Sequence, residues 1–129
     1  MVLLDTNVVS YFFRRDSRAE AYESVIVGRE RGIAFMTLAE LYKWPLERNW
    51  GARRREALET YLASHVVLPM DDEVARCWAR LIAGQAKLGR TFGFANAWIA
   101  ATALRHALPI VTHNKKHFEN VPGLEVISA

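Results

Sequence analysis

Three positions in the chain carry side chains with oxygen atoms that suit a divalent cation: Asp5, Glu40 and Asn96. Asp5 ends the apolar run 2–4, and Asn96 precedes the apolar stretch 97–103. Carboxylate and amide oxygens are ligands of hard cations such as Mg²⁺, and such a cation can orient a phosphodiester and activate a water for its hydrolysis. The residues therefore predict a metal-dependent nuclease in which an asparagine stands in place of a third acid.

The amide at Asn96 changes the electrostatics of such a site. Its oxygen can still coordinate Mg²⁺, but it brings no negative charge. A unit charge about 4 Å from a divalent ion gains roughly 8 kcal/mol gross at an effective dielectric near 20, before desolvation. The net loss is far smaller, yet it is enough to weaken or abolish metal binding.

Each of the three residues also has a simpler interpretation as a helix cap. Asp5 and Asn96 are good N-cap residues, Asp5 for a helix that starts near Val8. The sequence Thr37-Leu38-Ala39-Glu40 fits a capping box, in which Glu40 reaches back to the N-cap amide. A capping Glu40 could not point at Asp5 with the same rotamer, so both interpretations stay open at this level.

Other catalytic patterns are weaker. His113 and His117 have the spacing of a zinc pair on a helix, but no third His or Cys lies nearby. The sequence contains no Gly-rich phosphate loop and no Gly-x-Ser-x-Gly motif. A phosphorylated receiver domain would need two acids after the first strand, where only Asp5 is found, and Asp71 and Asp72 are typical of helix caps.

Short apolar runs alternate with amphipathic stretches along the chain, which predicts an α/β domain with a covered parallel sheet of about five strands. Ser17, Thr37 and Ala97 each open an expected helix, Leu58 lies within another, and Asp72 caps the one that Gly89 ends. The expected strands are 2–4, 33–36, 66–68, 110–112 and 124–127.

Two features of the expected elements matter for a site. Pro45 lies inside the helical pattern that runs from Thr37 to about Trp50, so we expect a kink or break there. Sites in open parallel sheets form beyond the carboxyl ends of the strands. The candidate residues that follow the strands are therefore expected to share that edge.

Composition limits the class of protein. A chain of 129 residues with 51% hydrophobic residues predicts one globular domain, 1–129. No apolar run approaches the roughly 20 residues that span a bilayer, and the N-terminus lacks the features of a signal peptide. The single cysteine, Cys77, cannot form an internal disulfide and is expected to be a small buried hydrophobic residue. These features predict a cytoplasmic protein with no membrane association.

The basic residues permit a polyanionic partner. Lys and Arg number 17 against 14 Asp and Glu, which gives a net charge of +3. A solvated helix face is the simpler interpretation of each cluster, and only convergence on one groove would make a nucleic-acid site. The clusters are 14–15 with 18, 53–55, 87 with 90, and 115–116.

Four segments together, in this order, resemble a PIN domain, and more narrowly the VapC-type toxins of toxin–antitoxin pairs. The resemblance implies an α/β/α sandwich with a central parallel sheet. It also implies a Mg²⁺- or Mn²⁺-dependent endoribonuclease, usually dimeric, that cleaves RNA and is inhibited by a VapB-type antitoxin. The segments are Leu3-Leu4-Asp5-Thr6-Asn7, Thr37-Leu38-Ala39-Glu40-Leu41, Asn96-Ala97-Trp98-Ile99-Ala100-Ala101 and Val111-Thr112-His113-Asn114-Lys115-Lys116-His117-Phe118.

The resemblance also implies roles for individual residues. Asp5 and Glu40 take the first two acidic positions, and Asn96 takes the third, where the family carries Asp. The hydroxyl and amide side chains would support the carboxylates or bind phosphate, and the lysines would contact the RNA backbone; these residues are Thr6, Thr112, Asn114, Lys115 and Lys116. Because of Asn96, we expect weak or no cleavage. The alternative is a catalytically inactive module that binds antitoxin or RNA.

Overall fold

The first strand of the chain lies at the centre of a five-stranded parallel sheet. A computed structural model describes residues 1–129. The strands are β1 (Val2–Leu4), β2 (Arg31–Ala34), β3 (Val66–Leu68), β4 (Ile110–Val111) and β5 (Val126–Ile127). Their order is β3-β2-β1-β4-β5, and every neighbouring pair is parallel.

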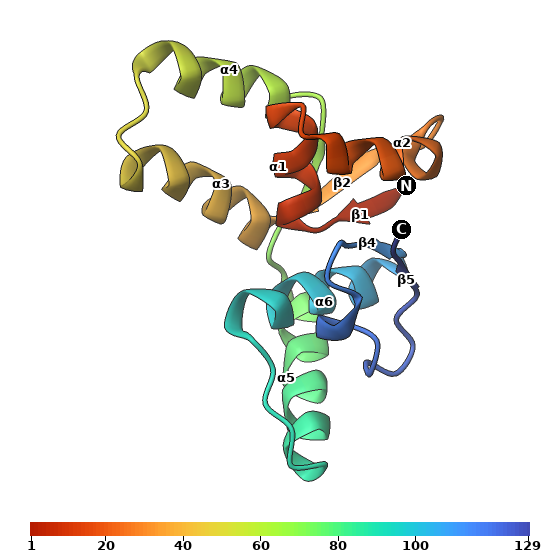
Figure 1. Ribbon diagram of the computed structural model, residues 1–129. Coiled ribbons are helices and arrows are strands. Elements are labelled where there is room, and N and C mark those ends of the chain that lie inside the picture. Colours follow the sequence, from red (N-terminus) through yellow and green to blue (C-terminus); the bar gives the residue numbers. More distant parts are fainter.

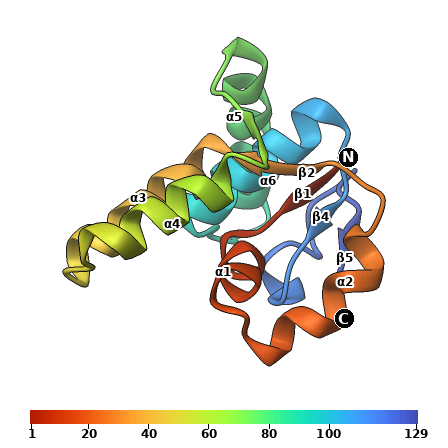
Figure 2. The ribbon, with the colours of Figure 1, turned by 90° about the horizontal axis from the view of Figure 1, so that it is seen from above.

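Helices cover both faces of this sheet. They are α1 (Thr6–Arg14), α2 (Glu20–Ile26), α3 (Phe35–Glu47), α4 (Ala52–Leu62), α5 (Asp72–Lys87) and α6 (Phe94–His106), with short 3₁₀ turns η1 (Ser17–Ala19) and η2 (Lys115–His117). Figure 1 shows α1 and α2 on one side of the sheet and α5 and α6 on the other, while α3 and α4 extend sideways together (Figure 2). The predicted α/β/α sandwich with a parallel sheet is confirmed.

Strand alternation separates the core into two clusters. Val2 and Leu4 pack with α1, α2 and α4, whereas Leu3 points to the opposite face and packs with α5 and α6. Ile110 and Val111 divide between the two faces in the same way. Because successive side chains of a strand point to opposite faces, a strand covered on both sides must be apolar throughout, and this is the pattern of residues 2–4.

The second strand and third helix differ from the sequence expectation. The strand ends at Ala34 rather than residue 36, and α3 starts at Phe35 rather than Thr37. Ala34 occupies the N-cap position and contributes no side-chain hydrogen bond, so the usual polar signal of a helix start is missing. Since Thr37 lies inside the first turn, the expected capping box with Glu40 is wrong.

Pro45 does not break α3, contrary to expectation. The helix continues to Glu47 and closes where Asn49 adopts a positive φ of 52°. The Trp50 amide donates to the Pro45 carbonyl oxygen at 3.0 Å, which satisfies one of the free carbonyls at the helix end. The left-handed residue, and not the proline, therefore ends this helix.

Caps also shift the starts of the last two helices. Asp71, rather than Asp72, caps α5: its carboxylate accepts a hydrogen bond from the Val74 amide at 2.7 Å. Gly93 is the N-cap of α6, so Asn96 lies within the first helical turn and is not the cap.

Cys77 on α5 is half-buried, which is less than expected. No helix has the length and apolar composition to cross a bilayer.

Candidate functional site

Asp5 lies directly beyond the carboxyl end of the central strand and is only 5% exposed. It serves as N-cap of α1, and its Oδ1 accepts a hydrogen bond from the Thr6 amide at 2.8 Å. Burial raises the pKa of the carboxyl, while hydrogen bonds from Thr112 and Thr6 and the charge of His117 lower it in part. The capping interpretation is thus correct but incomplete, because the second carboxylate oxygen has a different partner.

That second oxygen is held by Thr112, the residue that follows β4. The fully buried Thr112 hydroxyl donates to Asp5 Oδ2 at 2.8 Å and accepts a hydrogen bond from the Asn114 amide nitrogen at 3.0 Å. Asn114 therefore acts on this network through its backbone. Since β1 and β4 are adjacent and parallel, the residues after their ends meet at one edge of the sheet.

Glu40 reaches the same edge from α3. The Thr6 hydroxyl donates to Glu40 Oε1 at 2.7 Å and lies 3.0 Å from the hydroxyl of Thr37, which is fully buried. Thr6 thus contacts both carboxylates, Asp5 through its amide and Glu40 through its side chain. The role of Thr37 was missed in the sequence because the residue was assigned to a cap.

Asn96 joins the site through His117. Its Nδ2 lies 3.2 Å from His117 Nδ1. An amide nitrogen can only donate, so this contact requires an unprotonated Nδ1 and leaves Nε2–H as a donor on neutral His117. His117 also lies near enough to Asp5 that a positive charge on its ring lowers the pKa of the Asp5 carboxyl. In the sequence, His117 stands out only by its spacing from His113, and a contact spanning 21 residues leaves no local signal.

By ligand type, the candidate residues fit a hard divalent cation. The atoms that could bind a metal in Asp5, Glu40 and Asn96 are side-chain oxygens, the ligand type that Mg²⁺ and Mn²⁺ prefer. Neither carboxylate belongs to an ion pair of the protein, so no salt bridge offsets the desolvation of buried Asp5. No group of three or more His, Cys, Asp or Glu side chains is arranged to hold a metal, and the third position here is an amide.

His113 has separate partners from His117. Tyr22 places its hydroxyl 2.7 Å from His113 Nδ1 and donates to the Thr112 carbonyl oxygen at 3.3 Å. The ring of Tyr11 makes an edge contact with His113 at a centroid distance of 5.4 Å. These contacts fix the exposed His113 imidazole in the segment between β4 and η2. The sequence did not indicate either tyrosine as part of the site.

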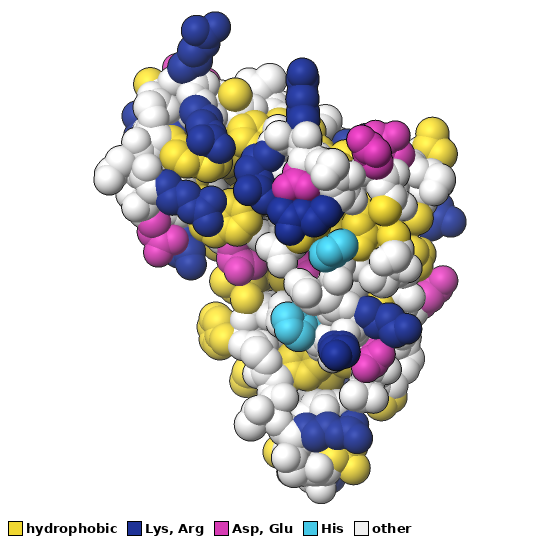
Figure 3. Space-filling model, in the orientation of Figure 1, with side chains coloured by type: hydrophobic (Ala, Val, Ile, Leu, Met, Phe, Trp, Pro, Cys, Tyr) yellow, Lys and Arg dark blue, Asp and Glu magenta, His cyan; other side chains and the backbone are white.

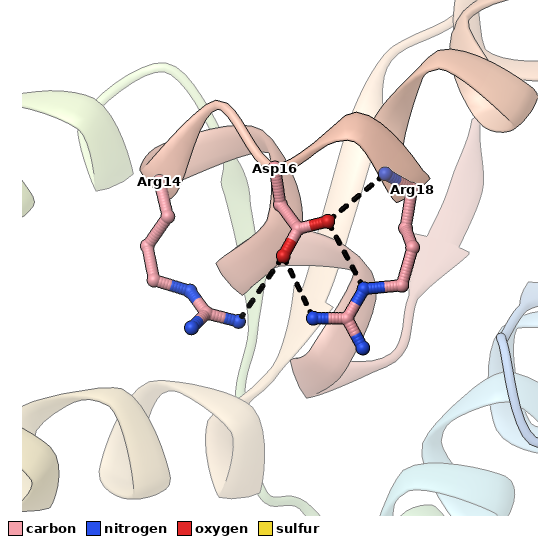
Figure 4. Close-up of polar contacts among 3 residues, drawn as sticks. All are labelled: Arg14, Asp16 and Arg18. Atoms are coloured by element: carbon pink, nitrogen blue, oxygen red, sulfur yellow. Dashed lines mark hydrogen bonds and ion pairs between the residues drawn. The ribbon is translucent and has the colours of Figure 1, made fainter.

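On the face shown in Figure 3, Lys and Arg side chains lie above and below exposed His side chains, with Asp and Glu side chains among them. Lys115 and Lys116 are exposed on η2, next to His117. In the cluster near η1, Arg14 and Arg18 both approach the Asp16 carboxylate, at 4.0 and 2.7 Å (Figure 4). Hydrogen bonds from Arg18 hold the pKa of Asp16 well below its usual range, so this cluster is partly neutralised.

The chain is similar to proteins of one family throughout its length. A model of the PIN domain matches residues 2–124. Ribonuclease VapC5 of Mycobacterium tuberculosis is 36% identical over 114 residues, which cover 87% of this chain and 82% of that protein. VapC ribonuclease Y4jK of Sinorhizobium fredii is 30% identical over 137 residues, with coverage of 99% and 96%.

A solved structure supports the same family as the sequence comparison. The structure of VapBC-1 from nontypeable Haemophilus influenzae superposes with a TM-score of 0.85 at 25% identity, and the match covers 99% of this chain and 98% of that one. The family match spans the strand ends that carry Asp5 and Thr112 as well as the helices that carry Glu40 and Asn96. The chain therefore belongs to the PIN-domain family and, within it, to the VapC ribonucleases.

Proposed function

We propose that this chain is the endoribonuclease toxin of a toxin–antitoxin pair, with a divalent-cation site centred on Asp5. The observation that carries the proposal is a buried carboxylate at the carboxyl end of the central strand, held by Thr6 and Thr112 and without a salt-bridge partner. Such a group suits a metal ligand better than a structural anion, because an unpaired buried charge is costly. The relatives named as ribonucleases support the same activity.

Asp5, Glu40 and the Asn96 oxygen would hold the cation, either Mg²⁺ or Mn²⁺. When bound, such an ion neutralises charge on a scissile phosphodiester and makes a water more acidic. Thr112 and Thr6 fix the two Asp5 oxygens, so the carboxylate is oriented before any substrate arrives. The Thr6 hydroxyl orients Glu40 toward the same edge, where Glu40 holds the metal or positions the water.

Asn96 sets the expected activity of this chain. Its amide adds no negative charge to the cation site, and its nitrogen donates to His117. An aspartate in the same place would add charge and would accept a hydrogen bond from His117 instead. We therefore propose that the chain with Asn96 cleaves RNA poorly or not at all.

Substitution of Asn96 by Asp tests this proposal. Asn96→Asp is expected to increase cleavage of total RNA by about 10–100-fold or more in Mg²⁺ or Mn²⁺, because it restores a ligand charge, and EDTA should abolish the gain. Asp5→Asn in the Asn96→Asp background serves as the control and should return cleavage to the starting level. Equal cleavage with and without the substitution at saturating Mg²⁺ would contradict the proposed role of position 96.

The proposed partners are RNA, a VapB-type antitoxin and a second copy of the chain. The antitoxin is proposed because the matching Haemophilus influenzae structure is of VapBC-1, and the dimer because it is usual among the proteins that the sequence resembles. A second candidate function is a catalytically inactive module that binds antitoxin or RNA. The hydrogen bond between Asn96 and His117 favours it, because it satisfies position 96 without a metal. Failure of Asn96→Asp to cleave any RNA would support this alternative.

A further inference from the structure

A cavity adjoins the candidate site between the loop after α5 and the segment that contains η2. Its volume is about 440 Å³, and Asn96 and His117 form part of its wall. Its ten lining residues include Arg90 and Lys116 but no Asp or Glu, and only one is hydrophobic. A cavity of this size is within the range of small-ligand sites. The positive charge of this lining favours a ligand with an anionic group, bound beside the candidate site of Asp5 and Glu40.

The backbone of one wall is fixed by the end of α5. Gly89 has a φ of +68°, and its amide donates to the Ala86 carbonyl oxygen at 3.0 Å. The Arg90 amide donates to the Gln85 carbonyl oxygen at 2.9 Å, which completes a Schellman motif. Arg90 is therefore placed by a defined helix end, while its exposed side chain stays free to reach a ligand.

Gln85 ties the two walls together and leaves one acceptor unused. Its side chain is 4% exposed, and its Nε2 donates to the Asn120 carbonyl oxygen at 3.3 Å. No donor of the protein is bonded to Gln85 Oε1, although the residue lines the cavity. Unlike the Nε2 atoms of His65 and His106, this oxygen is not sealed from solvent, so a ligand in the cavity can reach it. A ligand that donates a hydrogen bond into the cavity would satisfy this oxygen.

Two further donors face the same space. Neutral His117 offers Nε2–H when Nδ1 accepts from Asn96. The first turn of α6 has no side-chain cap, and its Gly93 and Asn96 line the cavity. The free amides at a helix N-terminus add to the attraction for a phosphate that Arg90 and Lys116 provide. The cavity thus combines cations, a free amide oxygen of Gln85 and amide donors.

We infer that this cavity binds a single nucleotide of a single-stranded RNA, adjacent to the phosphodiester held at Asp5 and Glu40. The inference rests on the proposed function and adds a subsite to it. Arg90 and Lys116 neutralise the phosphate, and Gln85 Oε1 and the exposed Asn120 amide bond the base edge. A paired and stacked nucleotide could not enter a cavity of this kind, so the strand must be unpaired there.

Binding of short RNA tests the subsite without any need for cleavage. The probes are fluorescently labelled single-stranded hexaribonucleotides that differ at one position, titrated with the unsubstituted chain and followed by anisotropy. Arg90→Gln is expected to weaken binding about 5–20-fold and to reduce the slope of log K against log salt by about 0.7, the value for one phosphate contact on a single strand. Arg29→Gln is the matched control, since Arg29 is an exposed cation before β2, at the opposite edge of the sheet; it should change affinity by less than about twofold.

Asn120→Ala distinguishes base recognition from charge. It should leave the salt slope unchanged and reduce the difference in affinity between hexamers that differ at the recognised position. Equal losses for Arg90→Gln and Arg29→Gln would overturn the inference, because they would indicate diffuse charge attraction. An unsubstituted chain that binds every hexamer alike, or none, would overturn it as well.

Cleavage by the Asn96→Asp chain separates this inference from the proposed function. Metal-dependent cleavage whose rate and sequence preference are unaffected by Arg90→Gln and Asn120→Ala would leave the nuclease in place and remove the subsite. Loss of cleavage selectivity in Asn120→Ala, with the metal requirement retained, would support the subsite as a determinant of specificity.

Discussion

The Asp5 carboxylate connects two adjacent strands, because one oxygen is bonded at its own helix start and the other by the residue after β4. Each hydrogen bond favours the ionised form, while burial opposes it and raises the pKa overall. The residue is thus held ready for a cation rather than neutralised by the protein. At this scale, the Thr112 hydroxyl orients one carboxylate oxygen and favours the ionised form of the carboxyl.

Replacement of Thr112 by valine isolates that hydroxyl. Thr112→Val keeps the shape but removes the donor to Asp5 Oδ2 and the acceptor for the Asn114 amide. We expect the pKa of Asp5 to rise further, and the free energy of unfolding to fall by about 1–3 kcal/mol. A carboxyl NMR titration and urea unfolding measure the two effects.

Thr102→Val is the matched control, since Thr102 is equally buried but donates to the Trp98 carbonyl within its own helix. It should leave the titration of Asp5 unchanged. Identical titration curves for Asp5 in the two variants would contradict the role assigned to Thr112.

The sequence predicts some of the site residues better than others. Asp5 and Thr112 could be placed at one edge because each directly follows an apolar run in a parallel sheet. The bridge through Thr6 could not, because it depends on α1 starting directly after Asp5 rather than near Val8. The functional roles of Asp5, Glu40 and Asn96 stay proposals that cleavage and metal binding must test.

At the scale of elements, helix starts were harder to predict than helix existence. The starts of α3 and α6 follow Ala34 and Gly93, neither of which provides a side-chain cap, so the polar residues inside the first turn were mistaken for caps. The end of α5 was predicted correctly, because Gly89 is the residue type that a left-handed C-terminal position favours. Side-chain caps leave a signal in the sequence, whereas caps made by backbone alone do not.

Two glycines, one inside α5 and one just beyond its end, should respond oppositely to substitution by alanine. Gly89→Ala is expected to lower the free energy of unfolding by about 1–2 kcal/mol, because Ala is disfavoured at a φ of +68°. Gly84→Ala, inside the helix with nothing within 4 Å of an added Cβ, should raise it by about 0.5–1 kcal/mol. Urea unfolding of both variants measures the two effects, and changes of the same sign would contradict the helix end described for Gly89.

At the scale of the whole molecule, the sheet separates two apolar clusters of equal size, with 11 buried residues each. Both clusters include residues of β1, β2 and β4, so neither face can be lost without exposing the other side of the same strands. We therefore expect both layers to unfold in one transition. Ionisable groups buried within either layer then affect the stability of the entire molecule.

His65 provides a pH-dependent contribution of this kind. It is 7% exposed, and its Nε2 has no hydrogen-bond partner. Burial lowers its pKa, so the unfolded chain binds the proton more tightly than the folded one. The free energy of unfolding should therefore be highest above about pH 6.5 and should decrease as the pH falls toward the lower pKa of the folded state.

Urea unfolding between pH 5 and 7.5 measures this decrease. His65→Gln removes the titrating group, and its stability should depend less steeply on pH than that of the unsubstituted chain. Parallel pH dependences would show that other groups determine the acid response.

The hydrogen bond between Thr112 and Asp5 joins residues that are 107 positions apart. During synthesis on a ribosome, a chain that ends before β4 has Asp5 and Glu40 but lacks the neighbour that completes the central strand. Long-range pairing of this kind forms late, because the intervening loop must close first. A nascent chain therefore remains without an assembled site until residues 110–117 have emerged, which delays any cleavage of RNA near the ribosome that makes it.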